Sequence, residues 1–108
     1  MDKEKYLESL LSEMPKLTKT LGENLGERVL KEANSFVDDS KENLIKWSAA
    51  MAKGELSKED YVWLLNSKKD LLKVTALKEI GLTQIQAEKF RNALFTLVIE
   101  QAEDFLQS

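Results

Sequence analysis

A helical repeat of apolar residues runs through the middle of the chain and decides its fold class. Steps of three and four residues connect Leu30, Ala33, Val37, Ser40, Leu44, Trp47 and Met51. This spacing places all seven on one side of an α-helix, and only Ser40 among them is polar. Because the repeat continues through Asp38-Asp39-Ser40, the sequence predicts one long, coiled-coil-like helix over residues 24–53. A restart at Asp39, with Glu42 closing a capping box, is the alternative.

The end of this helix and the start of the next are marked by local signals. Gly54 stands where a helix C-cap favours a left-handed residue. Ser57 follows as an N-cap, with Asp60 three residues later in the place of a capping-box partner. With only one proline and three other glycines in 108 residues, a turn-rich β fold is excluded.

A second break lies at Gly81. Leu82 is placed to fold back on Leu77 in a Schellman motif, and Thr83 with Gln86 forms a capping box. These signals predict helices near 58–80 and 83–106, joined by a very short connection. Such a connection makes two helices antiparallel neighbours.

The N-terminal region completes the expected bundle. Asp2 is a candidate cap for a helix over 2–14, which Pro15 interrupts. Gly22 and Gly26 favour a loosely wound helix start over a close helix crossing. The prediction is therefore all-α: one domain over residues 1–108, a small bundle of about four helices with a C-terminal antiparallel pair.

Several kinds of chemistry are excluded by residues that the chain lacks. Without histidine or cysteine it has no Cys/His zinc site, no Ser-His-Asp triad and no disulfide. No phosphate loop or nucleophile elbow occurs, and the carboxylates lie among other charged residues, as on a solvated surface. We therefore expect a cytoplasmic, non-enzymatic protein with no metal, no cofactor and no membrane segment.

Apolar residues in the C-terminal half exceed what one core-facing stripe requires. The last predicted helix has a full apolar stripe, yet Phe95, Ile99 and Leu106 fall outside it, and Trp63, Val74 and Leu77 do the same in the helix near 58–80. A surplus apolar face indicates an interface. The leading hypothesis is self-association, as a homodimer, through these six residues, and another helical protein is a further partner to consider.

Two alternatives use the same region differently. The apolar surface is also suited to a small apolar ligand or a lipid. Lys68, Lys69, Lys73 and Lys78 form a basic strip that fits an anion or nucleic acid. Because the net charge is −3, a solvated lysine face is the favoured interpretation of that strip, and nucleic acid is not an expected partner.

Overall fold

The computed structural model describes residues 3–67 and 72–106, with only the backbone for 105 and 106. Five α-helices and one 3-10 helix make up most of this part of the chain: α1 Lys3–Glu13, η1 Met14–Leu21, α2 Glu23–Ala52, α3 Lys58–Ser67, α4 Val74–Ile80 and α5 Gln84–Leu106. No strand occurs in these ranges. The all-α prediction is confirmed.

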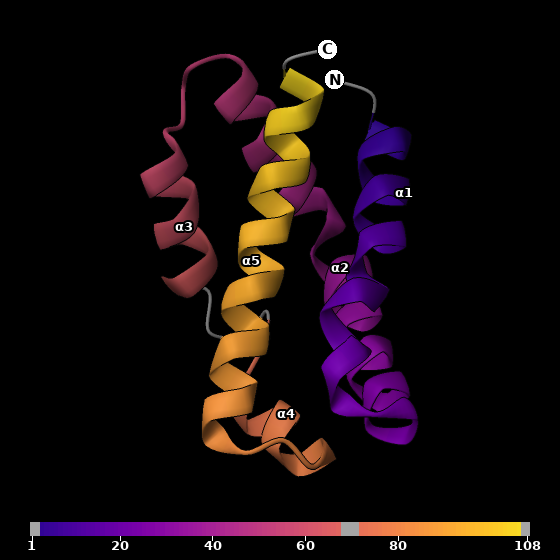
Figure 1. Ribbon diagram of the computed structural model, residues 1–108. Coiled ribbons are helices and arrows are strands. Elements are labelled where there is room, and N and C mark those ends of the chain that lie inside the picture. The colour runs from indigo at the N-terminus through magenta and orange to yellow at the C-terminus, as the bar shows by residue number, and fades with distance from the viewer. Residues whose placement is uncertain (1–2, 68–71, 107–108) are drawn as a thin grey trace.

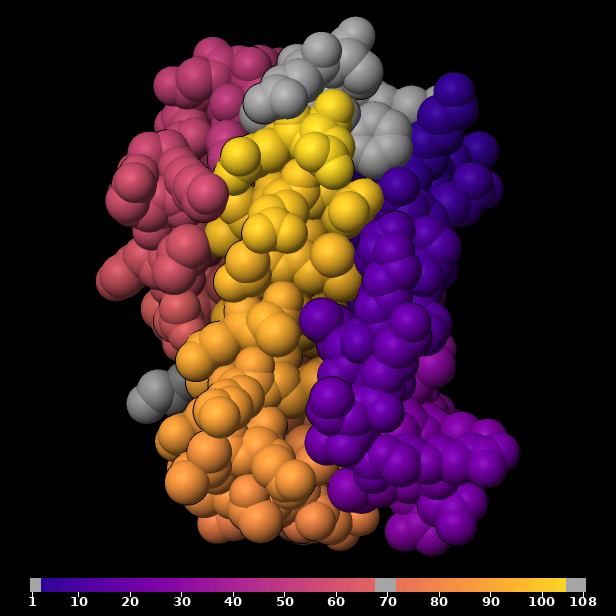
Figure 2. All heavy atoms as spheres, in the orientation of Figure 1, coloured from indigo at the N-terminus to yellow at the C-terminus, as the bar shows by residue number. Residues whose placement is uncertain are grey.

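Helix α5 is the central element of the bundle. It stands between α3 and α1, while α2 crosses behind it and α4 lies across the lower end (Figure 1). It contacts α1, α2, α3, α4 and η1. Figure 2 shows that one side of α5 remains open to solvent. Exposed polar residues recur every four positions in this helix, at Glu88, Asn92, Thr96 and Glu100. The buried apolar residues of α5 lie under the other helices, which cover it on more than one side.

The long helix predicted over 24–53 is confirmed as α2, and no restart occurs at Asp39. Its end follows the predicted glycine signal. Gly54 has a φ of 76°, its N–H donates to the Met51 carbonyl, and the Glu55 N–H donates to the Ala50 carbonyl. These two bonds are those of a Schellman motif, which satisfies carbonyls that the helix end leaves open.

The capping signals near the two later helices are also confirmed. The Asp60 N–H donates to Ser57 Oγ at 3.0 Å, which caps α3. At α5 the Thr83 N–H donates to Gln86 Oε1 at 3.0 Å, and the Gln86 N–H donates back to Thr83 Oγ1 at 3.1 Å. This reciprocal pair is a complete capping box.

The prediction of one helix near 58–80 is wrong. Helix α3 ends at Ser67, and α4 begins at Val74 after Lys73, whose φ of −88° and ψ of 134° are extended. Packing explains the break. Helix α4 lies across the lower end of the bundle, in a different direction from α3, and there it contacts α2 and α5 and buries Leu77 (Figure 1). The core therefore overrides a helical pattern that contains no glycine or proline.

The N-terminal prediction is right about Pro15 and wrong about Gly26. Helix α1 ends at Glu13, and Pro15 lies in the first turn of η1; the proposed cap at Asp2 lies outside the described residues. Gly26 is buried inside α2, and a Cβ added there would lie 3.2 Å from the Thr18 carbonyl oxygen. The glycine thus permits a close crossing of η1 over α2, not a loosely wound start.

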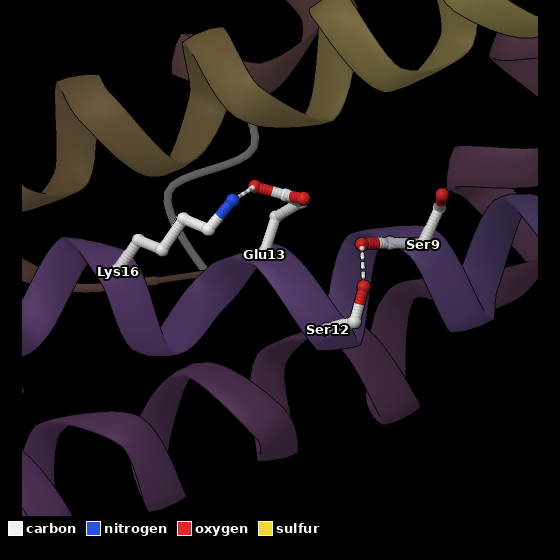
Figure 3. Close-up of polar contacts among 4 residues, drawn as sticks. All are labelled: Ser9, Ser12, Glu13 and Lys16. Carbon is white, nitrogen blue, oxygen red and sulfur yellow. Dashed lines mark hydrogen bonds and ion pairs between the residues drawn. The ribbon is translucent and has the colours of Figure 1, made fainter.

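Two exposed polar contacts accompany the change from α1 to η1 (Figure 3). The Glu13 carboxylate and the Lys16 ammonium point toward each other at 2.6 Å, and Ser12 Oγ donates to the Ser9 carbonyl at 2.9 Å. Both join residues three apart. That separation places side chains on one side of a helix, and most closely so in a 3-10 turn.

Candidate functional site

Three of the six residues predicted to form an interface lie inside the protein. Leu77, Phe95 and Ile99 are 0%, 4% and 2% exposed. Helix α5 is covered on more than one side, and Phe95 packs against Phe36 of α2 with ring centroids 5.9 Å apart. The expectation that these three side chains offer surplus surface is wrong.

The other three residues have different positions. Val74 is partly buried against the core, and the side chain of Leu106 lies outside the described residues. Trp63 is 67% exposed on α3, beside Val62 at 40%. Val62, Phe95 and Ile99 line a narrow groove of about 250 Å³ between α3 and α5. Of the predicted set, Phe95 and Ile99 therefore meet at this groove, whereas Trp63 does not line it.

The predicted basic strip is described only in part. Lys68 and Lys69 lie outside the described residues, whereas Lys73 and Lys78 are exposed, just before α4 and in its last turn. An anion site built on all four lysines stays a prediction.

A larger hollow lies elsewhere, between α1 with the start of η1 on one side and α2 on the other. It has a volume of about 520 Å³ and is lined by Leu7, Leu11, Pro15, Leu30, Asn34, Val37, Asp38 and Lys41. We call it the α1–α2 groove. Because α1 runs down the molecule and α2 runs back up, its two walls are antiparallel (Figure 1).

The walls of the α1–α2 groove repeat at helical spacing. Leu7, Leu11 and Pro15 follow one another every four residues along α1 and η1. Leu30 and Val37 belong both to the groove and to the apolar repeat that predicted α2. The groove therefore arises where one edge of the core stripe of α2 is left uncovered by α1.

The depth and rim of the groove differ in polarity. Val37 is buried at its base and Leu7 is half-buried, whereas Leu11 is 42% exposed at its mouth. Exposed Asp38 and Lys41 stand on the α2 side, 3.8 Å apart. The result is an apolar floor with a polar edge. From the sequence, the spacing of Leu7, Leu11 and Pro15 was the available signal.

A second notable cluster consists of buried hydroxyl groups. The Tyr61 hydroxyl lies 3.0 Å from Ser48 Oγ and donates to the Leu44 carbonyl, and the Tyr6 hydroxyl donates to the Val98 carbonyl at 3.2 Å. Burial raises the pKa of Tyr61 and of Tyr6 above the ordinary value of 10.0, and that of Tyr61 by a large amount. These contacts connect α1, α2, α3 and α5. Both tyrosine rings are fully buried, so the hydroxyl groups have no access to a substrate.

Two further findings bear on the kind of site this chain carries. Over the described ranges, no three acidic side chains come together in a way that would hold a metal ion. None of the helices described combines the length and the apolar character needed to cross a membrane. Comparison of the chain with protein-family models, with curated proteins and with solved structures finds no match.

Proposed function

We propose that this is a non-enzymatic binding protein, and that its α1–α2 groove receives the apolar side of an amphipathic helix from a partner protein. The observation that supports it is the apolar groove between two antiparallel helices, whose lining residues repeat every three or four positions. Grooves of this kind accept helices that carry apolar anchors at i, i+4 and i+7. A partner helix would add one more member to the bundle.

A small apolar ligand or lipid is the main alternative for the same groove. A volume of about 520 Å³ is within the usual range for such ligands. Two features favour a helix. Leu11 is exposed at the mouth, so an occupant remains partly open to solvent, and the walls are straight helical ridges.

The test uses a panel of labelled synthetic helical peptides that carry leucine at i, i+4, i+7 and i+11. Leu11→Glu should weaken their binding at least about ten-fold, since burial of one leucine contributes about 1.5–3 kcal/mol. Ile85→Glu is the matched control, because Ile85 is also an exposed apolar residue, at 65%, and does not line the groove. Peptide binding that Leu11→Glu does not weaken would contradict the proposal. Leu11-dependent binding of a fatty acid, with no peptide bound, would replace it with the ligand alternative.

Self-association is the second candidate, and the exposure of Trp63 favours it. Tryptophan is enriched among residues that dominate binding energy at interfaces, and Val62 extends the apolar surface of α3. Light scattering after size-exclusion chromatography should show a dimer that Trp63→Ser dissociates. A monomer at high concentration would rule this candidate out, and a dimer insensitive to Trp63 would move the interface away from α3.

The proposal includes a cytoplasmic location, since a chain without cysteine gains no disulfide stability in an oxidising compartment. Binding of nucleic acid through the lysines near α4 has no further support and stays a hypothesis. Its test is binding of DNA or RNA at low salt.

A further inference from the structure

The α1–α2 groove continues beyond its main hollow. A second hollow of about 260 Å³ follows it along α2 and shares Pro15 and Leu30 with it. On the α2 side the second hollow is lined by Glu23, Gly26, Glu27 and Leu30, and Gly22 lines it just before the helix begins. Together the two hollows extend from Gly22 to Lys41. At 1.5 Å per residue this is about 28 Å of α2, enough for a partner helix of about 19 residues.

The two ends of this extended groove differ in charge. At one end Asp38 has Lys41 beside it, 3.8 Å away. At the other end Glu23 and Glu27 lie one helical turn apart, both exposed, and no ion pair in the described part of the chain involves either. Lys19 faces the same hollow and offsets only one of the two carboxylates. This end therefore carries a net negative charge.

We infer that the partner helix is basic at its C-terminal end and lies antiparallel to α2, with that end beside Glu23 and Glu27. Lysine or arginine there would complement the two carboxylates. The direction follows from the dipole of the partner helix. Basic residues are most stable at the C-terminus of their own helix, so a partner whose basic residues face Glu23 and Glu27 places its C-terminus there, whereas the dipoles of the antiparallel α1 and α2 walls oppose each other. The inference rests on the proposed function and adds to it the chemistry and direction of the partner.

The experiment compares two 19-residue peptides of identical composition and identical leucine stripe. One carries its lysines in the last turn and the other in the first turn. The first should bind about two- to thirty-fold more tightly at low ionic strength, as expected for two exposed ion pairs, and the difference should shrink as salt is added. The double variant Glu23→Lys/Glu27→Lys should reverse the preference, because it replaces attraction of the peptide lysines by repulsion.

The matched control is Glu59→Lys/Asp60→Lys, because these acids occupy the first turn of α3 as Glu23 occupies that of α2, and they do not line the groove. It should leave the preference unchanged. If the lysine variant of the groove does not fold, Glu23→Gln/Glu27→Gln should remove the preference, because it neutralises both carboxylates. Circular dichroism reports the fold of each variant.

The outcomes separate this inference from the function on which it rests. Equal binding of both peptides, abolished by Leu11→Glu, would overturn the inference and leave the proposed function standing. A preference for lysines in the first turn would also overturn it, since the direction would be reversed. If neither peptide binds in a Leu11-dependent manner, the proposed function fails and the inference fails with it.

Discussion

Replacing Tyr61 with phenylalanine removes one hydroxyl from the interior and leaves the ring in place. That hydroxyl meets Ser48 Oγ at 3.0 Å and the Leu44 carbonyl at 3.2 Å, and both Tyr61 and Ser48 are fully buried. The substitution therefore removes the hydrogen bond to the Leu44 carbonyl and also takes the Tyr61 partner from the buried Ser48 Oγ. We expect a loss of about 1–2 kcal/mol in the free energy of unfolding, and about 1 kcal/mol for Ser48→Ala.

The double variant gives the sharper result. Tyr61→Phe leaves Ser48 Oγ without its Tyr61 partner, and Ser48→Ala then removes that oxygen. The double variant Tyr61→Phe/Ser48→Ala should therefore be about as stable as Tyr61→Phe alone. The coupling between the two positions should then be about 1 kcal/mol. Against a total stability of about 5–15 kcal/mol for a domain of this kind, such a difference is readily measured.

Urea denaturation is the assay. Trp47 is a suitable fluorescent probe, because its ring packs edge-on against Tyr61 with centroids 5.9 Å apart. Thr96→Val is the control, since Thr96 is exposed on α5 and its loss should change stability by no more than about 0.5 kcal/mol. A cost below about 0.5 kcal/mol for Tyr61→Phe, or strict additivity in the double variant, would show that the hydroxyls do not form a stabilising network.

Three further predictions concern stability. Thr83→Ala should cost about 1 kcal/mol in urea denaturation by removing the cap of α5, and an unchanged midpoint would show that the cap contributes nothing. Gly81→Ala should cost about 1–2 kcal/mol, because Gly81 has a φ of 135° and a new Cβ would lie 3.3 Å from a methyl carbon of Leu25; a thermal midpoint at or above that of the parent chain would contradict this. Burial raises the pKa of Tyr61 and Tyr6 in the folded chain. Their contribution to the free energy of unfolding is therefore complete below pH 10 and is lost above it, because tyrosines ionise there in the unfolded chain. Above pH 10 the free energy of unfolding should fall by up to about 2.7 kcal/mol per pH unit because of this pair, and about half as steeply in Tyr61→Phe. The absorbance of tyrosinate should rise only when the chain unfolds.

Local chemistry made several features predictable from the sequence. The capping box at Thr83 and Gln86, the cap at Ser57 and the glycine ends at Gly54 and Gly81 each depend on residues within five positions of one another. The length of α2 was predictable for a related reason. Its apolar repeat is read along one helix and requires no knowledge of what covers it.

Features that depend on distant residues were not predictable in this way. The break between α3 and α4 follows from the burial of Leu77 against helices far away in the chain. Phe95 and Ile99 were predicted to be surplus apolar surface because a single apolar stripe implies one buried side of a helix. Helix α5 is instead covered on more than one side. The α1–α2 groove depends on how closely η1 crosses α2 at Gly26, which no local pattern specifies.

The central place of α5 has a consequence for biosynthesis. The ribosome makes α1, η1, α2, α3 and α4 before the helix that contacts all of them, and Tyr6 finds the Val98 carbonyl only after 92 further residues have been joined. Until then the apolar sides of the earlier helices have no common partner. Translation that stops before residue 84 would leave a nascent chain unable to complete its core, exposed to chaperones and proteases. Completion of this core is therefore a late event that waits for α5 to leave the exit tunnel.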